Sequence, residues 1–486
     1  MGKRTETGVV IVGTGFSGLG MAIQLRKEGR EDFVILEKAG DVGGTWRDNS
    51  YPGCACDIPS HMYSFSFEQN PGWSRAYSPQ PEIWRYMRGV ADKHDLRRFV
   101  RFGQEMTGSR WDADENRWYV TTASGDEFVA EALVLGVGAL HLPMIPALPG
   151  IENFAGRAFH SARWDHGYDL AGKRVAVVGT GASAIQFVPK IAPDVANLTL
   201  FQRTPPWVMP KPDRAMPGWL RALFRAVPPV QRAYRDFVYW RLEARALGFN
   251  GQSWVMKLGQ RLAKRNIDKA VKDPGLRAKL TPDYTMGCKR VLISNDYYPA
   301  LARDNVDVVT DGVAEVREHS VVDTAGVEHE VDAIIYGTGF HVTDAFDELE
   351  ILGRDGRDLG KEWASEGMRT HLGITVSGFP NLFMLLGPNT GLGHNSVVFM
   401  IESQISYVAE ALRMARGRAL DTRPEAQERF NSEIQRKLAK GIWTRGGCKS
   451  WYLDAKGVNR TIWPGFTWRY WLATRKVRRS DYELLG

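Results

Sequence analysis

The stretch VVIVGTGFSG, residues 9–18, decides the fold of this chain. Its first four residues are β-branched, which is typical of a buried strand, and residues 19–27 that follow have helical periodicity. A second apolar run, residues 33–36, ends at Glu37. This order of strand, glycine-rich turn, helix and strand predicts a βαβ unit with two parallel strands.

The glycines of this turn stand where a dinucleotide phosphate requires them. Gly13 permits a tight turn, Gly15 lets the backbone approach a pyrophosphate, and Gly18 lets the helix pack closely on the strand. The N-terminus of the helix adds free N–H groups and a favourable dipole. Glu37 lies 19 residues after Gly18, where an acid can accept hydrogen bonds from a ribose hydroxyl. The first unit therefore predicts a dinucleotide site.

The same pattern returns further along the chain. A strand-like run, residues 174–178, is followed by the turn GTGASA, residues 179–184, and the next strand, residues 198–202, ends at Arg203. Arg203 lies 19 residues after Ala184, so the register of the first unit is repeated while the charge is reversed. Because a guanidinium can clamp a 2′-phosphate, this second site should prefer NADPH to NADH.

One acid-ended and one arginine-ended unit in a single chain predict FAD together with NADPH. Residues 132–138 form a buried strand that ends in glycines, and the proline-rich residues 141–150 follow it. A similar strand with Gly-x-Gly returns at residues 331–340, so we expect the second domain to be inserted into the first. The predicted fold class is α/β, with two Rossmann-like dinucleotide-binding domains and a helical subdomain.

The strand and helix signals also give expected boundaries. Arginine-rich amphipathic helices are indicated over about 213–280, and we expect them to pack on the NADP domain rather than to lie on a membrane surface. In chain order, the predicted parts are 1–145 (FAD-binding, first part), 146–212 (NADP-binding, first part), 213–280 (helical subdomain), 281–332 (NADP-binding, second part) and 333–486 (FAD-binding, second part, with a mobile C-terminal loop).

Composition narrows the function classes. With 486 residues, 43% hydrophobic and 24% charged, the chain has ordinary globular usage and room for two or more domains. Its four cysteines, at 54, 56, 288 and 448, suit neither a secreted disulfide framework nor a zinc site, which favours a reducing, cytoplasmic compartment. The net charge of +7 comes from scattered residues, so we expect no nucleic-acid partner. We also expect no metal, no membrane span, and a monomer or small homo-oligomer.

Residues 154–165, FAGRAFHSARWD, carry a family resemblance. They resemble, position for position, the FxGxxxHxxxW(P/D) fingerprint of type I Baeyer–Villiger monooxygenases, a class B flavoprotein family. Residues 43–57, GGTWRDNSYPGCACD, are similar to the family's GGxWxxxxYPGxxxD motif. Disulfide reductases share both cofactors but need a redox cysteine pair, and Cys54 and Cys56 have the wrong spacing for one.

The resemblance implies roles for individual residues. Lys289 and Arg290 resemble the family's KR pair, whose arginine sits over the flavin and whose lysine contacts the 2′-phosphate of NADPH. Asp57 resembles the carboxylate that holds this arginine, so Arg290 and Asp57 are the candidate catalytic residues. Trp451 resembles the tryptophan of the mobile substrate loop. We expect the glycine-rich loop, residues 387–396, to line the flavin, with its His394 a scaffold rather than an acid.

The remaining candidates fall into two groups. The fingerprint residues are Phe154, Gly156, His160, Trp164 and Asp165, of which His160 and Trp164 are expected to be structural residues at the hinge between domains. The cofactor-binding residues that the turns and the resemblance indicate are Gly13, Gly15, Ser17, Gly18, Glu37, Lys38, Gly44, Thr45, Trp46, Asp57, Ile58, Tyr63 and Met106 toward FAD, and Gly179, Thr180, Gly181, Ala182, Ser183, Ala184, Arg203, Thr204 and Lys289 toward NADPH, with Arg290 over the flavin.

The activity that the resemblance implies is conversion of ketones to esters or lactones by NADPH and molecular oxygen, through a flavin peroxide. A buried anion of this kind needs a fixed cation, and Arg290 suits it because a guanidinium does not lose its proton. A protonated peroxide would oxidise thioethers instead, so the same residues permit sulfoxidation. Two alternatives stay open: a flavin-containing S- or N-monooxygenase, and a non-catalytic flavin and NADP redox-sensing protein.

Overall fold

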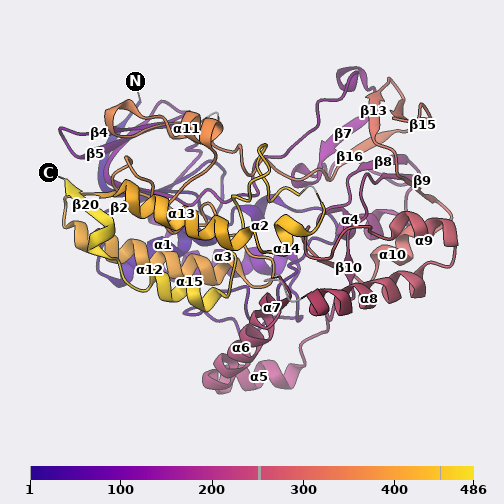
Figure 1. Ribbon diagram of the computed structural model, residues 1–486, viewed down its shortest axis with the longest axis horizontal. Coiled ribbons are helices and arrows are strands. Elements are labelled where there is room, and N and C mark those ends of the chain that lie inside the picture. Colours follow the sequence, from indigo (N-terminus) through magenta and orange to yellow (C-terminus); the bar gives the residue numbers. More distant parts are fainter. Residues whose placement is uncertain (1, 250–252, 348, 449, 486) are drawn as a thin grey trace.

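The computed structural model describes residues 2–249, 253–347, 349–448 and 450–485. Two α/β halves lie side by side, and a pair of helices, α5 and α6, projects from their lower edge (Figure 1). Each half is organised around its own sheet, and each sheet carries one of the two glycine-rich turns. The fold class predicted from the sequence is confirmed.

The first half contains an 8-stranded sheet with the strand order β17-β4-β5-β6-β1-β2-β3 and with β18 paired to β6. β1 pairs in parallel with β2 and with β6, as the βαβ pattern predicts. Because β17 and β18 come from the last third of the chain, the chain returns to this sheet after leaving it. The strands are β1 (Arg4–Val12), β2 (Phe33–Glu37), β3 (Val100–Phe102), β4 (Met106–Asp112), β5 (Arg117–Thr122), β6 (Glu127–Leu135), β17 (Glu350–Leu352) and β18 (Leu382–Met384).

Both faces of this sheet are covered. Alternate residues of β1 enter two different cores: Val9 and Ile11 pack with the helices, while Val10 and Val12 belong to a second core that includes Trp118 of β5. Such two-sided burial explains why the strand is apolar at every position rather than at every second one. The helices of this half are α1 (Phe16–Lys27), α2 (Thr45–Asp48), α3 (Gln80–Lys93), α11 (Leu359–Glu366), α12 (Val397–Ala415), α13 (Pro424–Leu438) and α15 (Thr467–Thr474).

The second half contains a parallel 5-stranded sheet with the order β12-β9-β8-β16-β7. β16 lies between β8 and β7, so a strand from beyond residue 330 completes the sheet begun near residue 157. The strands of this sheet are β7 (Arg157–His160), β8 (Arg174–Val178), β9 (Asn197–Phe201), β12 (Val306–Val309) and β16 (Ala333–Tyr336). A separate three-stranded sheet is formed by β13 (Val313–Val316), β14 (Ser320–Asp323) and β15 (Glu328–Glu330). The helices of this half are α4 (Ala184–Ile191), α9 (Pro274–Leu280) and α10 (Tyr297–Leu301).

The two connections between the halves run side by side. The Met144 N–H donates to the Gly339 carbonyl at 3.0 Å, and the His341 N–H donates to the Leu142 carbonyl at 3.0 Å. Pro143 and Phe340 form the antiparallel bridge between these two bonds. The outgoing and returning segments therefore form a two-stranded link.

The helical region differs from the sequence-based expectation. Its helices are α5 (Gly218–Ala226), α6 (Pro228–Glu243), α7 (Ala246–Phe249) and α8 (Ser253–Ala270), and α8 does lie against the second half, near β10 (Val208–Met209) and α10. The prediction of packing on the NADP domain is wrong for α6. Arg235 of α6 donates to the His61 carbonyl at 2.5 Å, and Tyr239 packs on Phe399 of α12 with ring centroids 5.1 Å apart, so α6 lies on the first half.

The remaining short elements complete the edges of the molecule. β11 (Leu292–Ile293) pairs with β10, and β20 (Tyr482–Leu485) pairs antiparallel with β19 (Ala419–Thr422). α14 (Ile442–Arg445) comes shortly before Cys448, which forms a disulfide with Cys288. The cysteine count did not predict this bond, while Cys54 and Cys56 carry buried free thiols.

Candidate active site

The first glycine turn has the shape that a phosphate needs. Gly13 has φ of +96°, and a Cβ on it would lie 2.7 Å from the Gly136 carbonyl oxygen. A Cβ on Gly18 would lie only 1.8 Å from the Gly13 carbonyl oxygen, so both positions exclude a side chain. In contrast, apart from the two adjacent residues, no described atom lies within 4 Å of a Cβ built on Gly15, so a ligand phosphate can approach the backbone there. The residues present fit a dinucleotide.

The second turn repeats this construction. Gly179 has φ of +105°, and its Cβ would lie 2.6 Å from the Gly337 carbonyl oxygen, just as Gly13 meets Gly136. Gly181 corresponds to Gly15, since the nearest atom to its Cβ is 3.7 Å away. The turn continues through the exposed Ala182 and half-buried Ser183 into Ala184, which begins α4. In the first half Gly136, after β6, leaves room for the turn, and in the second half Gly337, after β16, does the same.

Glu37 lies at the end of β2, but its carboxylate already has partners within the protein. Oε2 accepts from the Thr14 N–H at 3.1 Å, and Oε1 accepts from the Ala39 N–H at 2.9 Å. Arg47 Nη1 lies 3.1 Å from Oε1, an ion pair that the sequence did not reveal. The ribose contact expected at Glu37 stays a prediction, as does the role of Lys38, whose Nζ lies 3.2 Å from Glu105 Oε1.

The GGTW motif comes back onto the first turn. A Cβ on Gly44, which has φ of +50°, would lie 3.2 Å from Gly15 Cα, so the two loops touch. Gly44 precedes α2, whose first residues are Thr45 and the buried Trp46. Trp46 Nε1 donates to Tyr63 Oη at 3.1 Å. The structure thus brings four of the predicted FAD contacts, Gly15, Gly44, Trp46 and Tyr63, into one connected region.

The other predicted FAD positions surround this region. Ser17 is buried in the first turn of α1, and Ile58 is buried with its N–H 3.4 Å from Cys56 Sγ. Met106 begins β4 and is buried, and the nearby Gln104 N–H donates to the Glu37 carbonyl at 3.0 Å. Met106 therefore follows a loop, residues 103–105, that is hydrogen-bonded to the end of β2.

Arg290 and Asp57 form the charged centre of the site although 233 residues separate them. Arg290 Nε and Nη2 donate to the same oxygen, Asp57 Oδ2, at 2.9 and 2.6 Å. The attraction of Asp57 raises the pKa of Arg290, which keeps the guanidinium charged. Its third nitrogen, Nη1, is 3.5 Å from the Leu392 carbonyl of the glycine-rich loop, a weak contact that leaves this nitrogen available. The side chains of Arg290 and Asp57 are 30% and 26% exposed.

Tyr452 is a neighbour of Arg290 that the sequence analysis did not single out. It follows Trp451, and burial raises the pKa of its hydroxyl to about 12 while the nearby Arg290 charge opposes this rise. Trp451 itself is 47% exposed, and its ring centroid lies 4.4 Å from that of Tyr452. The disulfide between Cys288 and Cys448 joins the segment that carries Arg290 to the segment that carries Trp451.

Lys289 and Arg203 lie close together at the second turn. Burial, and then the positive charge of Arg203, lower the pKa of Lys289. Lys289 Nζ also lies 5.2 Å from the centre of the Tyr284 ring. Thr204 follows Arg203, and its carbonyl accepts from Thr180 Oγ1 at 3.3 Å, which fixes the arginine beside the glycine turn. Asp283 attracts Lys289 less strongly than Arg203 repels it, so the two neighbouring cations suit an anionic group such as a 2′-phosphate.

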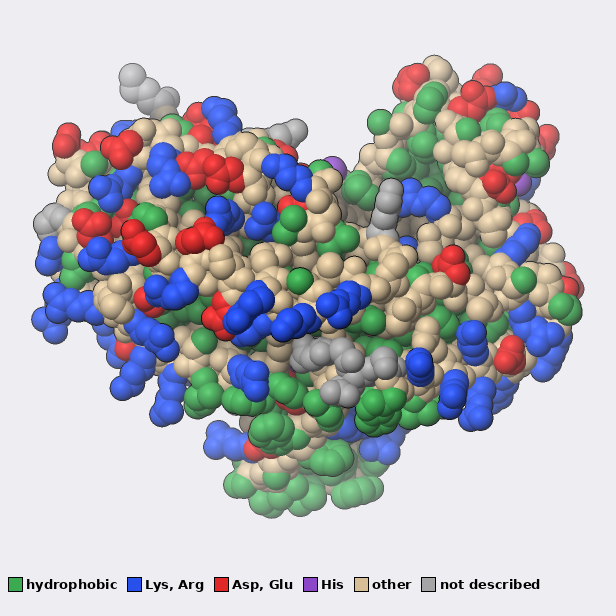
Figure 2. Space-filling view, viewed as in Figure 1, with side chains coloured by type: hydrophobic (Ala, Val, Ile, Leu, Met, Phe, Trp, Pro, Cys, Tyr) green, Lys and Arg blue, Asp and Glu red, His purple; other side chains and the backbone are tan. Residues whose placement is uncertain are grey.

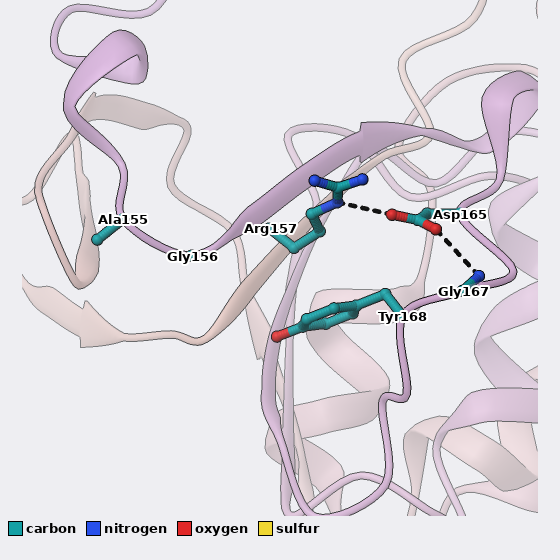
Figure 3. A pocket seen from close by; sticks show the side chains of 6 residues that line it. All are labelled: Ala155, Gly156, Arg157, Asp165, Gly167 and Tyr168. Carbon is teal, nitrogen blue, oxygen red and sulfur yellow. Dashed lines mark hydrogen bonds and ion pairs between the residues drawn. The ribbon is translucent and has the colours of Figure 1, made fainter.

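The end of the fingerprint is held by an ion pair and a hydrogen bond (Figure 3). Arg157 Nε donates to Asp165 Oδ2 at 2.6 Å, and Asp165 Oδ1 accepts from the Gly167 N–H at 3.0 Å. A Cβ on Gly156 would lie 2.4 Å from the Asp332 carbonyl oxygen and 2.6 Å from Phe154 Cζ. These contacts give the first and last fingerprint residues a structural function.

The middle of the fingerprint lies between the halves. His160 Nδ1 accepts from the Ala162 N–H at 3.1 Å, its ring faces Phe340 at 5.6 Å, and burial lowers its pKa to about 4. Trp164 packs on Phe187 of α4 at 5.3 Å, and Phe187 also meets Tyr51 of the YPG loop at 6.1 Å. These contacts fit the structural role expected at the hinge.

His394 of the glycine-rich loop is a buried scaffold residue. Glu243 Oε1 lies 3.2 Å from His394 Nε2 and accepts from Asn395 Nδ2 at 2.7 Å and from Thr467 Oγ1 at 2.8 Å. Burial favours the neutral acid, but the bonds from His394, Asn395 and Thr467 outweigh it and lower the pKa of Glu243. Glu243 thus ties α6 to the loop before α12 and to α15.

Comparison with known proteins gives one consistent group. The family described as FMO-like, flavin-binding monooxygenase-like, matches residues 6–220. A Baeyer-Villiger monooxygenase of Pseudomonas aeruginosa is 54% identical over 98% of this chain and 91% of its own, and one of Streptomyces coelicolor is 51% identical over 98% and 92%. The closed structure of cyclohexanone monooxygenase has a TM-score of 0.88 at 28% identity, with 99% of both chains covered.

A second solved structure agrees. Oxidized steroid monooxygenase bound to NADP has a TM-score of 0.88 at 31% identity and covers 99% of this chain and 100% of its own. Among the helices that the structure describes, none combines the length and the apolar composition of a membrane span. Since more than half of the residues are shared with a curated relative over nearly the whole length, the chain belongs to the Baeyer–Villiger monooxygenases of the flavin-binding monooxygenase-like family.

Proposed function

We propose that this protein is an FAD- and NADPH-dependent monooxygenase that converts ketones to esters or lactones. The observation that carries this proposal is the guanidinium of Arg290: two of its nitrogens donate to one oxygen of Asp57, and its third nitrogen makes a weak 3.5 Å contact with the Leu392 carbonyl. A cation so fixed suits a carbonyl oxygen that becomes negatively charged. The high identity to two Baeyer-Villiger monooxygenases supports the same assignment.

Each cofactor has a set of residues that would hold it. The first turn, with the open position at Gly15 and the adjoining Gly44, would hold FAD, and the second turn, with Arg203 and Lys289, would hold NADPH. When bound, the flavin supplies the activation of molecular oxygen with electrons from NADPH. The chain's own contribution is to place both cofactors and the ketone and to supply fixed charge.

Arg290 would act on the ketone oxygen. As the carbonyl carbon becomes tetrahedral its oxygen gains negative charge, and a preorganised donor lowers the energy of that state. Asp57 orients the guanidinium, and its charge keeps Arg290 in place when no substrate is bound. The neighbouring Tyr452 is buried and, with its pKa raised to about 12, stays protonated at neutral pH.

Product analysis tests the proposed reaction. The protein is incubated with NADPH, ¹⁸O₂ and a panel of cyclic and linear ketones together with one thioether, and products are identified by mass spectrometry. We expect esters or lactones that carry one ¹⁸O atom. Sulfoxide with no ester from any ketone would favour an S-oxygenase instead. The cytoplasmic location, the oligomeric state and the domain boundaries stay predictions from the sequence.

A further inference from the structure

An exposed apolar surface covers the projecting helices, at the lower edge of the molecule in Figure 2. Trp219 of α5 is 69% exposed, Phe237 and Trp240 of α6 are 63% and 60% exposed, and Trp254 of α8 is 65% exposed. Large apolar patches on a protein surface mark sites of interaction. We call this set the apolar face, and it consists of Trp219, Val230, Phe237, Trp240, Trp254, Trp471 and Leu472.

Helix α6 has large apolar side chains on its exposed side as well as on its buried side. Val230, Phe237 and Trp240 recur at intervals of seven and three residues, which places them on one stripe, and this stripe faces solvent. The buried side of the same helix contains Val238 and Leu242 together with the polar residues Gln231, Arg235 and Glu243. A surface helix normally exposes polar residues, so the exposed apolar stripe of α6 offers a contact surface to a partner.

A groove joins α6 to α15 and extends the apolar face. It has a volume of about 490 Å³ and lies between α6, α12 and α15. Trp240 forms one side, Trp471 of α15 another, and Phe399 of α12 also lines it. Trp471 is 42% exposed and the next residue, Leu472, is 52% exposed, so α15 continues the same surface.

The surroundings of the apolar face are strongly basic. Residues 214–265 contain eleven lysines and arginines but two acids, Asp236 and Glu243. Glu243 is buried in its own hydrogen-bond network, so only Asp236 of the two faces solvent. The exposed cations here are Arg214, Arg225, Arg232, Arg241, Arg245, Lys257, Arg261, Lys264 and Arg265.

We propose that the apolar face docks on the surface of an anionic lipid bilayer. Tryptophan and phenylalanine on one side of a helix with lysine and arginine around them fit the boundary between headgroups and acyl chains, where rings enter and cations meet phosphates. A second copy of this chain fits less well, because a two-fold contact would bring two basic rims together. The inference revises our expectation for residues 213–280 and does not depend on the proposed reaction.

Vesicle sedimentation of the full-length holoenzyme tests the docking. The protein is centrifuged with vesicles of phosphatidylcholine alone or with three parts in ten of phosphatidylglycerol, without ketone. We expect partition onto the anionic vesicles to exceed that onto the neutral ones by at least about tenfold at low salt, and to weaken as salt screens the cations. An equal and negligible partition onto both kinds of vesicle would overturn the proposal.

Two variants separate the apolar and basic contributions. Phe237→Ser with Trp240→Ser should lower binding at least about tenfold, and so should Arg232→Glu with Arg241→Glu. The matched controls lie on the second half: Val327→Ser, which is 52% exposed beside β15, and Lys173→Glu with Arg303→Glu. Circular dichroism melts confirm that each variant is folded.

Sedimentation velocity without lipid tests the alternative that a second copy of this chain binds the apolar face. A parent dimer that becomes a monomer in the Phe237→Ser and Trp240→Ser variant, with no binding to vesicles, would assign the face to a second copy and overturn the proposal. Binding of that variant equal to the parent's would overturn it as well. Since no step uses enzyme activity, failure here is distinct from failure of the proposed reaction.

Discussion

At the scale of single residues, the site depends on charges whose partners are fixed. One oxygen of Asp57 accepts hydrogen bonds from two of the three guanidinium nitrogens of Arg290. These two bonds fix the orientation of the guanidinium plane, and the third nitrogen does not bind Asp57. Lys289, the preceding residue, lies near Arg203, whose positive charge lowers the pKa of Lys289 more than the attraction of Asp283 raises it. We therefore expect these two adjacent residues to contact different ligands.

The cations at the second turn should determine the choice of cofactor. We expect Arg203→Ala or Lys289→Ala to raise the KM for NADPH by about 10- to 150-fold, because one charge-assisted contact to the 2′-phosphate is lost. The KM for NADH, which lacks this phosphate, should change little. Steady-state kinetics with both cofactors measure the effect, with Arg303→Ala as a control. Equal changes for NADPH and NADH would show that these residues do not contact the phosphate.

At the scale of elements, one buried carboxylate joins three segments. Glu243 at the end of α6 accepts hydrogen bonds from Asn395 before α12 and from the backbone and side chain of Thr467 in α15. It also lies beside His394, and the side chains of both are 2% exposed. The glycine-rich loop that reaches Arg290 is therefore anchored from the helical subdomain.

Removal of this carboxylate should destabilise the fold. We expect Glu243→Ala to lower the free energy of unfolding by about 3 kcal/mol, because several buried donors lose their acceptor at once. Asp236→Ala, on the exposed side of the same helix, should change it by less than about 0.5 kcal/mol. Urea unfolding followed by circular dichroism gives both values. Equal effects of the two variants would contradict the anchoring role.

Contacts between residues close in the sequence could be predicted from it, whereas contacts between distant residues could not be predicted from pattern alone. The βαβ units at 9–37 and 174–203 are local patterns, and the structure confirms both. The pairing of Arg290 with Asp57 came from the family resemblance, since no periodicity links residues 233 apart. The same reason hid the disulfide, whose cysteines are 160 residues apart.

Helix α6 shows a different limit of the sequence. Periodicity identified the positions that share a face, but it could not say which face is buried, and the usual assumption that apolar means buried is wrong for Phe237 and Trp240. The ion pair between Arg47 and Glu37 could not be predicted either, because the spacing of the motif that contains Arg47 does not indicate this contact.

At the scale of the whole molecule, buried histidines make stability depend on pH. Burial lowers the pKa of His61, His160 and His371 to about 4 each. A histidine in the unfolded chain titrates near 6.5, so between these values the unfolded chain binds more protons and acid favours unfolding. The contribution is fully present above about pH 6.5 and falls as the pH drops toward 4.

We expect about 2 kcal/mol per histidine to be lost between pH 7 and pH 5. Urea unfolding at the two pH values measures the loss. His61→Gln should show a smaller difference between them than the parent, whereas His319→Gln, which alters an exposed side chain, should behave like the parent. A His61→Gln variant with the parent's full pH dependence would contradict this assignment.

The most direct test of the account is the ratio of ester formed to NADPH consumed in Arg290→Ala. Placement of the two cofactors should survive, so the variant should bind FAD and still oxidise NADPH, while ester formation falls by about 10²–10³-fold and hydrogen peroxide takes its place. Arg290→Lys should restore little, because an ammonium cannot keep both contacts to Asp57. Ester formation by Arg290→Ala at the parent's rate, with NADPH consumption still coupled to it, would contradict the central role of this cation.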